Sequence, residues 1–353
     1  MKIAIYAIAK NEEKHVLRFL SAASDADLIL IADTGSTDNT VSIARDWGAT
    51  VAHVDITPWR FDRARQAALE LLPDDIDVCI SVDLDEVMLP GWRKAVEAAW
   101  TAGTTRLTYR FDFGQGLIYD CTKAHARHGY EWKWPCHEYI APMAGVLETM
   151  AKTEAVLTVH EPDCTKSRGQ YLDLLAVGVA EAPDDARMAF YYGRELYYRQ
   201  EWPKAIDELM RYLALPDAIY THERAYAMGA IARAHKACAN LYECQAWLRR
   251  ACAEAPWIRD PWVNLAQAAY DWRDWEECFY AAHKAVKITE RQYFYTSDPV
   301  AWTDKPHDLL ALAAYNLNLR ELAAYHGRKA LELNPKDTRL AKNLDFYTQE
   351  THH

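Results

Sequence analysis

The fold of this chain is decided by a short apolar strand that runs straight into an acidic turn, residues 78–86, VCISVDLDE. The apolar run Val78–Val82 predicts a buried strand. Asp83 and Asp85 follow it two positions apart, so both carboxylates are expected to aim at one small volume. Hard oxygen ligands of this kind suit Mg²⁺ or Mn²⁺. Such a cation keeps open positions for substrate phosphates, which makes a nucleotide diphosphate the natural second ligand.

Strands and helices alternate in the sequence before this strand. Strands are predicted over residues 3–8, 28–31 and 50–54, and helices near 13–24, 38–47 and 62–72. This alternation is typical of an α/β domain with a mostly parallel sheet. Ligands of such sheets gather at the carboxyl ends of the strands. The loops at those ends are polar and mostly acidic: KNEE at 10–13, DTGSTD at 33–38 and DLDE at 83–86.

The pattern changes between residues 105 and 165. Aromatic-rich strand candidates cover residues 106–113, 130–140 and 155–160. We interpret them as an antiparallel addition to the sheet.

After about residue 170 the strand signals end and a helical repeat begins. Its small side chains recur at Gly193, Ala232, Ala266 and Ala311, at Ala205, Cys244, Cys278 and Ala323, and at Ala251, Ala285 and Ala330, with Tyr212 as the exception. The spacing fits a helix-turn-helix unit of about 34 residues. Small residues let paired helices approach closely, and Pro256 and Pro335 are placed to end the second helix. The longest interval contains residues 294–306, which predicts an inserted loop. An unrelated helical bundle is the alternative.

Composition bounds the partners and the compartment. The formal net charge is −11, from 51 acidic and 40 basic residues. General nucleic-acid binding is therefore disfavoured, although a local basic patch stays open. Eight cysteines without a CxxC pair indicate reduced thiols. With no signal-peptide pattern in the first residues and no apolar run of membrane-spanning length, we expect a cytoplasmic protein without a membrane span.

The turn after the second predicted strand has two interpretations. Gly35 supplies backbone freedom and Ser36, Thr37 or Asp38 can cap the next helix. This structural interpretation does not explain why Asp33 ends an apolar strand. A carboxylate at that position can accept hydrogen bonds from a base or a ribose.

Taken together, four motifs resemble family-2 glycosyltransferases in order and spacing: Asn11-Glu12-Glu13, Asp33 to Asp38, Phe61-x-x-Ala64-Arg65 and Val82 to Glu86. The resemblance covers roughly residues 1–165 and is closest to bacterial and phage members in which tetratricopeptide repeats follow the catalytic domain. It implies an α/β domain of the GT-A (nucleotide-diphospho-sugar transferase) type over residues 1–168 and an all-α tetratricopeptide-like repeat domain over residues 169–353.

The resemblance also implies roles for single residues. Asp33 would contact the nucleobase, Glu12 the base and ribose, and Arg65 the nucleotide, while Asp83 belongs to the donor site and Asp85 holds the metal. A histidine that completes the metal shell in related enzymes corresponds to His160. Two departures are Gln66, where an Asn is usual, and Leu84, where an Ala is common. Neither removes a ligand oxygen.

The family normally inverts the anomeric carbon, so a general base must deprotonate the acceptor. The segment WKWPCHE at 132–138 offers Glu138 and His137 beside indole rings, and Glu138 is the first choice. Glu161, which follows His160, is a further candidate. Lys166 and Arg168 are placed to close over the diphosphate, with a solvated loop as the alternative.

The sequence therefore predicts a metal-dependent, inverting glycosyltransferase that uses Mn²⁺ or Mg²⁺ and a nucleotide-diphosphate sugar. A protein, a saccharide or another acceptor would be held by the repeats, and a homodimer stays open. The alternative is a non-catalytic interaction protein with a degenerate GT-A domain and partner-binding repeats. A nucleotidyltransferase is disfavoured, because its Gly-rich basic loop is absent after the first strand, where the chain reads Ala9 to Glu12.

Overall fold

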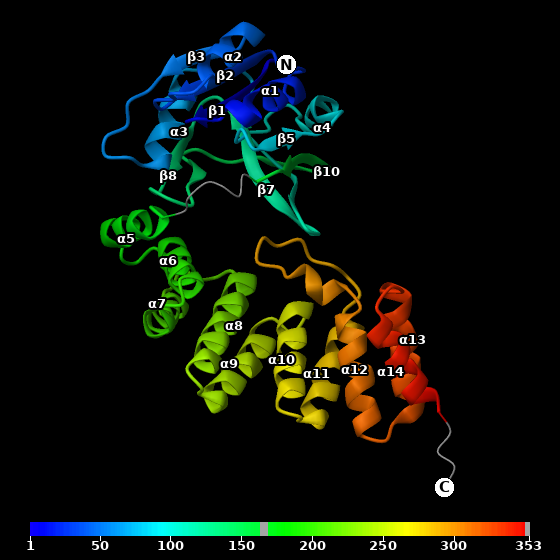
Figure 1. Cartoon of the computed structure of the whole chain (residues 1–353). Coiled ribbons are helices and arrows are strands. Elements are labelled where there is room, and N and C mark those ends of the chain that lie inside the picture. The colour runs from blue at the N-terminus through cyan, green and yellow to red at the C-terminus, as the bar shows by residue number, and fades with distance from the viewer. Residues whose placement is uncertain (163–168, 350–353) are drawn as a thin grey trace. The chain divides into compact units, whose positions relative to one another are not determined.

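A computed structural model describes residues 1–162 and 169–349 of the chain. The chain divides into two compact units, Met1–Ala182 and Pro183–His353, which are described separately (Figure 1). Helix α5 (Tyr171–Glu181) belongs to the first unit. The domain boundary expected after residue 168 stays a prediction, since it adjoins residues that the structure does not describe.

The first unit is built on an eight-stranded sheet of order β3-β2-β1-β4-β7-β6-β10-β5. Its strands are β1 (Ile3–Ala9), β2 (Leu28–Asp33), β3 (Thr50–His53), β4 (Val78–Ser81), β5 (Glu86–Met88), β6 (Arg106–Gly114), β7 (Leu117–Ala126) and β10 (Met150–His160). The first four are parallel to one another. Strands β8 (Tyr130–Lys133) and β9 (Tyr139–Pro142) form a separate antiparallel ribbon. The predicted α/β class is confirmed.

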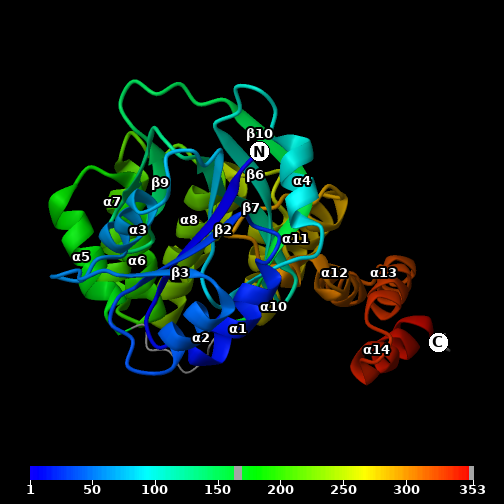
Figure 2. The ribbon, with the colours of Figure 1, turned by 90° about the horizontal axis from the view of Figure 1, so that it is seen from above.

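Helices cover both faces of the sheet because its central strands are apolar on both sides. Along β1, Ile3 and Ile5 pack against α1 (Glu13–Ala22), α2 (Thr40–Trp47) and α4 (Trp92–Ala99). Ala4 and Tyr6 face the opposite side, toward α3 (Phe61–Glu70) and the β8–β9 ribbon. Alternation along one strand thus divides the core into two layers (Figures 1 and 2).

The region after residue 105 differs from the expected antiparallel addition. Strand β7 pairs antiparallel with β4 and β6, but β10 runs parallel to β6 and antiparallel to β5. The single strand expected over residues 130–140 is two strands. It breaks because Trp134 and His137 have positive φ values of 80° and 53°, which extended backbone does not allow.

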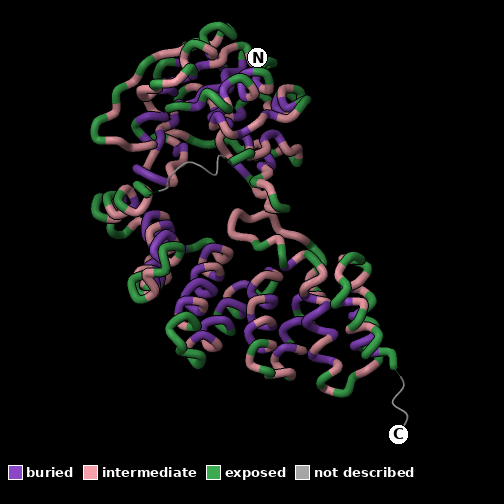
Figure 3. The backbone as a smooth tube through the Cα atoms, in the orientation of Figure 1, coloured by how far each residue is buried: buried purple, intermediate pink, exposed green. Residues whose placement is uncertain are grey.

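The second unit is all helical, which confirms the predicted repeat class. Its helices are α6 (Ala186–Tyr198), α7 (Trp202–Ala214), α8 (Thr221–Ala237), α9 (Leu241–Glu254), α10 (Arg259–Asp271), α11 (Trp275–Lys287), α12 (Lys305–Asn316), α13 (Arg320–Leu333) and α14 (Thr338–Thr348). The inserted segment before α12 carries a short 3₁₀ helix, Pro299–Trp302. The buried side of each helix faces its neighbours (Figure 3).

The small residues that defined the repeat lie where helices meet. Ala232, Ala266 and Ala311 are fully buried, as are Ala205 and Cys278. At Gly193 on α6, an added Cβ would stand 2.8 Å from Cδ2 of Leu209 on α7. The close approach of these two helices therefore requires glycine.

Among residues 1–162 and 169–349, no helix has the length and apolarity needed to cross a membrane.

Candidate functional site

Parallel pairing brings three loops to one edge of the sheet. Strand β1 lies between β2 and β4, with Ala9 opposite Asp33 and Tyr6 opposite Ser81. The loops that follow these strands carry Glu12, Asp33 and Asp83. The predicted gathering of these loops at the carboxyl ends is therefore observed.

The Asp33 carboxylate caps its own turn. It accepts hydrogen bonds from the backbone N–H groups of Gly35 at 3.2 Å and Ser36 at 3.1 Å. Gly35 has φ 100°, so the turn requires the freedom of glycine. His53 Nδ1 lies 3.5 Å from the same carboxylate. Asp33 thus has a structural role at this position, and its predicted contact to a nucleobase stays a prediction.

The first loop is bonded to the second through side chains. Asn11 Oδ1 accepts from the Thr37 N–H at 2.7 Å, and the Glu12 N–H donates to Thr40 Oγ1 at 2.7 Å. Asp38 accepts from the Glu13 N–H at 3.1 Å. These bonds fix Glu12, which is 9% exposed, beside the strand ends.

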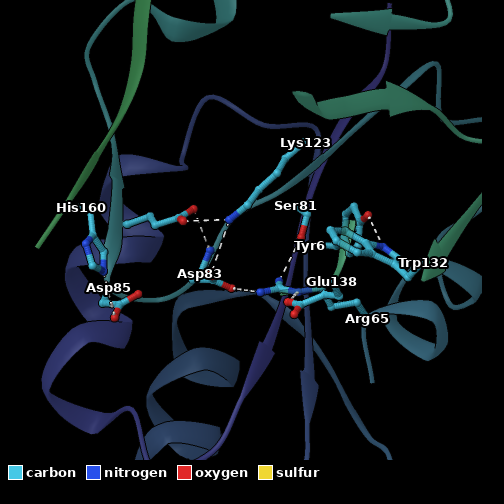
Figure 4. Close-up of polar contacts among 10 residues, drawn as sticks. Tyr6, Arg65, Ser81, Asp83, Asp85, Lys123, Trp132, Glu138 and His160 are labelled. Atoms are coloured by element: carbon cyan, nitrogen blue, oxygen red, sulfur yellow. Dashed lines mark hydrogen bonds and ion pairs between the residues drawn. The ribbon is translucent and has the colours of Figure 1, made fainter. Parts of the chain in front are cut away.

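Arg65 is the centre of the site. It extends from α3 and its three nitrogens reach three partners: Nε donates to Glu138 Oε1 at 2.6 Å, Nη1 to Ser81 Oγ at 3.1 Å and Nη2 to Asp83 Oδ1 at 2.6 Å (Figure 4). The guanidinium also lies over the Trp132 ring, 5.1 Å from its centroid. The guanidinium spreads five N–H groups over three nitrogens, so each partner here has a nitrogen of its own, whereas a lysine offers its three N–H groups from one nitrogen.

Lys123 continues the chain of charges on the other side of Asp83. Its Nζ donates to Glu86 Oε1 at 2.8 Å and to Asp83 Oδ2 at 3.3 Å. Glu86 in turn accepts from the Asp83 N–H at 3.1 Å. The charges therefore alternate from Glu138 through Arg65, Asp83 and Lys123 to Glu86 (Figure 4).

Electrostatics keep Asp83 charged. Burial by itself raises the pKa of this carboxyl, but Arg65 and Lys123 outweigh burial and hold the pKa well below its usual range. Burial by itself would lower the pKa of Lys123, yet Asp83 and Glu86 keep that pKa well above its ordinary value. Burial raises the pKa of Glu86, with Lys123 opposing it. Asp83 thus stays ionised, with one cation at each of its two oxygens.

The two aspartates of the acidic motif point to different partners. Asp83 is bonded to Arg65 and Lys123, whereas Asp85 Oδ2 lies 3.5 Å from His160 Nε2. Pairing of β10 with β5 sets His160 opposite Glu86, and the Phe113 ring packs on the imidazole with centroids 4.7 Å apart. The structure therefore brings the two predicted metal ligands together and separates them from Asp83.

The pair fits a divalent cation that takes its other ligands from a substrate. Neighbouring ligands of an octahedral Mg²⁺ lie about 3 Å apart, close to the distance between Asp85 and His160. His160 Nδ1 is buried without a hydrogen-bond partner among the described residues. No cluster of three or more acidic, histidine or cysteine side chains suited to a metal occurs in the described ranges. Within the described part of the chain, Asp85 and His160 are thus the two side chains placed to hold a cation here.

The loop between β8 and β9 presents Glu138. Its two positive-φ residues, Trp134 and His137, direct successive side chains away from a strand's alternation. Glu138 turns toward Arg65, and its side chain is 11% exposed. The His137 ring instead meets Tyr171 of α5, with centroids 5.9 Å apart. Only one of the two neighbours, Glu138, therefore contacts the network.

A buried hydrogen-bond chain supports the site from below. His125 Nδ1 lies 2.8 Å from the Ala126 carbonyl, which can only accept, so this nitrogen carries the proton. His125 Nε2 then accepts from the Tyr6 hydroxyl at 2.8 Å, and Tyr6 accepts from Trp132 Nε1 at 3.0 Å. Burial lowers the pKa of His125 to about 4. The chain holds the indole on which Arg65 rests.

The remaining predicted residues are Lys166, Arg168 and Glu161. Lys166 and Arg168 lie outside the described residues. Glu161 pairs with Arg18 of α1. Sequence reasoning missed Lys123 and Ser81, and the signal for Lys123 was a lysine in the alternating run Tyr119 to His125.

The first unit is thus an α/β domain with an acidic motif at the end of a strand. Residues 5–148 match the model of the family described as Glycosyl transferase family 2. The first unit therefore carries a family-2 glycosyltransferase domain, and this assignment supports a nucleotide-sugar donor.

Solved structures resemble parts of the chain at low identity. TarS 1–349 of S. aureus is 12% identical, with 70% of this chain and 92% of that chain covered and a TM-score of 0.44. MamA is 17% identical, with 48% and 89% covered and a TM-score of 0.38. YrrB, described as a TPR protein with an unusual peptide-binding site, is 12% identical, with 50% and 82% covered and a TM-score of 0.41. The family assignment stands on the match of residues 5–148.

Proposed function

We propose that the first unit transfers a sugar from a nucleotide-diphosphate donor to an acceptor in a single, inverting displacement. The observation that carries this proposal is the alternating charge network, which joins the acidic motif to Glu138 through Arg65. Charged side chains gathered in this way at the carboxyl ends of the strands are typical of functional sites, which supports the proposal.

Glu138 is proposed as the general base. As the acceptor oxygen attacks the anomeric carbon, its proton passes to Glu138 and the bond to the diphosphate oxygen breaks with its electron pair. Asp85 belongs to the leaving-group side, because it is turned toward His160. His137 and Glu161 stay as alternative bases, although their contacts to Tyr171 and Arg18 take them away from the network.

Asp85 and His160 are proposed to hold Mn²⁺ or Mg²⁺ together with the donor. When bound, the cation would neutralise charge on the departing diphosphate. Glu12, Asp33, Arg65 and Asp83 are proposed to position the nucleotide and its sugar, and Lys166 and Arg168 to close over the diphosphate.

The helix pairs of the second unit are proposed to bind the acceptor or a second copy of the chain. Among the described residues, every candidate for chemistry lies in the first unit, whereas stacked helix pairs present extended surfaces. Sedimentation at several protein concentrations, with and without an acceptor candidate, distinguishes the two roles.

The donor proposal is tested by thermal unfolding with nucleotide diphosphates and their sugars, with Mn²⁺ and with excess chelator. A ligand that binds only the native state raises the apparent stability. We expect one nucleotide to raise Tm only when the cation is present, and its sugar conjugate to be hydrolysed slowly. If no nucleotide binds the folded protein under either condition, the non-catalytic interaction protein is the better description.

A further inference from the structure

Part of the alternating charge network is buried and part of it is accessible to solvent. The side chains of Arg65 and Glu86 are 6% and 5% exposed, whereas those of Asp83 and Lys123 are 32% and 26% exposed. Asp83 and Lys123 also contact each other at 3.3 Å. A molecule that reaches Asp83 therefore lies against Lys123 as well. We call these two side chains the Asp83–Lys123 rim.

The Lys123 ammonium has a hydrogen to spare. It carries three N–H groups, and two of them are used by Glu86 and Asp83. Within residues 1–162 and 169–349, the other contact of the ammonium is with the ring of Phe111, whose centroid lies 5.9 Å from Nζ. Each Asp83 oxygen has one protein cation as a partner and a second lone pair left. The rim thus offers a ligand one donor and an acceptor side by side.

Charge decides which ligand fits this rim. In the network, the carboxylates of Glu138, Asp83 and Glu86 face the cations Arg65 and Lys123, so its net charge is −1. A net negative cluster repels a diphosphate but does not repel a neutral polyol. Neighbouring hydroxyl groups of a sugar both donate and accept, and so they match an adjacent carboxylate and ammonium.

We propose that the Asp83–Lys123 rim binds hydroxyl groups of the transferred sugar, with Lys123 donating to one hydroxyl oxygen and Asp83 accepting from a neighbouring one. This inference rests on the proposed donor and deepens it, since it makes Lys123 a sugar-specificity residue. The diphosphate is left to the Asp85 side of the site.

The test measures affinity for matched pairs of ligands, by titration calorimetry with Mn²⁺: UDP with UDP-glucose and UDP-N-acetylglucosamine, and GDP with GDP-mannose. We expect wild type to bind one sugar conjugate more tightly than its diphosphate. Lys123→Met should weaken the conjugate by about 10- to 100-fold, the worth of a hydrogen bond from a charged group. Its affinity for the diphosphate should stay unchanged.

Lys123→Met leaves Glu86 buried without its cation, which threatens the fold. The double variant Lys123→Met with Glu86→Gln removes that charge as well and should show the same selective loss. Lys123→Arg keeps a cation and should restore part of the preference for the conjugate. Lys94→Met, at an exposed lysine of α4, is the matched control and should behave as wild type.

The outcomes separate this inference from the proposed function. Equal weakening of conjugate and diphosphate would assign Lys123 to the phosphates and overturn the inference, as would unchanged affinity for both. If the wild type binds a diphosphate and its sugar conjugate with equal affinity, the proposed sugar contacts of the Asp83–Lys123 rim are contradicted, whereas the proposed nucleotide site is not. A wild type that binds no nucleotide contradicts the proposed function itself.

Discussion

Arg65 Nε lies 2.6 Å from Glu138 Oε1, while Nη2 of the same guanidinium lies 2.6 Å from Asp83 Oδ1. One side chain therefore fixes the proposed base relative to the donor side of the site. The distance between the carboxylates of Glu138 and Asp83 is therefore set by the width of the guanidinium. A single residue of α3 thus positions the proposed base relative to the acidic motif.

Arg65→Lys should cut transfer by about 10²-fold, because misplacing a reacting group by about 1 Å has an effect of that size. An ammonium cannot reach Glu138, Ser81 and Asp83 at once, and so Tm should fall too. The same measurements, steady-state kinetics and thermal unfolding, are made on Arg65→Lys and on the control Arg63→Lys. Arg63 is exposed and lies two residues earlier on the same helix. Wild-type kinetics in Arg65→Lys would contradict the positioning role.

Glu138→Gln should retain affinity for donor and Mn²⁺ while transfer falls by about 10²–10⁴-fold, the usual worth of a positioned base. Binding is measured by calorimetry and transfer by product formation. His137→Ala and Glu161→Gln are the comparison variants. Normal transfer in Glu138→Gln together with a dead Glu161→Gln would move the base to the other loop, and retained anomeric configuration in the product would overturn the single displacement.

Asp85→Asn and His160→Ala should each raise the Mn²⁺ concentration needed for half-maximal donor binding by about tenfold or more, because each removes one of the two proposed ligands of the cation. The readout is donor affinity at a series of Mn²⁺ concentrations. Asp74→Asn, at a side chain that is 87% exposed, is the control. Cation-independent donor binding by wild type would exclude a metal at this site.

Gly193→Ala should destabilise the second unit by about 1–3 kcal/mol, the usual cost of overpacking. The new Cβ would stand 2.8 Å from two carbons of Leu209. Gly229→Ala in α8 is a matched helical control whose Cβ meets only Arg233, at 3.4 Å, and it should be neutral or stabilising by about 0.5–1 kcal/mol. Urea unfolding of the two variants gives the comparison, and equal effects would contradict the close helix packing.

Stability of the first unit should fall as the pH is lowered from 7 to 5. Burial lowers the pKa of His125 to about 4 in the folded state, below the ordinary value of about 6.5. The unfolded chain therefore takes up the proton first, and the stability is full above pH 6.5 and declines toward pH 4. The loss is about 2 kcal/mol at pH 5.

His125→Asn should lower stability at pH 7 but flatten this decline, as measured by urea unfolding at the two pH values. His128→Asn, at a side chain that is 65% exposed, should keep the wild-type slope. An unchanged slope in His125→Asn would show that other groups set the acid sensitivity.

Local signals in the sequence predicted the parallel strands and the helix pairs. The apolar run Val78–Val82 and the loop Asp33–Asp38 each carry their information within a few residues. The small residues at Gly193, Ala232, Ala266 and Ala311 recur at intervals of 39, 34 and 45 residues, near the length of one helix pair, so the second unit could also be predicted. What failed was non-local: β7 has register shifts against β6, and the β4 residues with which it pairs lie 44–48 positions away in sequence.

For the candidate site, too, local features could be predicted from the sequence and contacts between distant residues could not. The acidic motif could be predicted, but a spacing of two residues suggested a shared target, and only the tertiary contacts show that Asp83 and Asp85 have different partners. Lys123 could not be assigned a role without knowing that β7 lies beside β4. The break at Trp134 and His137 was likewise hidden, because positive φ is rare for Trp and a single His, although it adopts positive φ more often than most residues, does not predict it.

The antiparallel insertion of β7 has an evolutionary consequence. Ala126, His125 and Ala124 pair with β4 in a fixed register, and neighbouring side chains on a strand point to opposite faces. A slip of β7 by one position against β4 would exchange the two faces of β7 and turn Thr122 or Ala124 toward Asp83 in place of Lys123. The register of β7 therefore decides which side chain stands beside Asp83, so in descendants of this chain an insertion or deletion in the hairpin turn after β6 should persist only where the turn absorbs it and the register is kept.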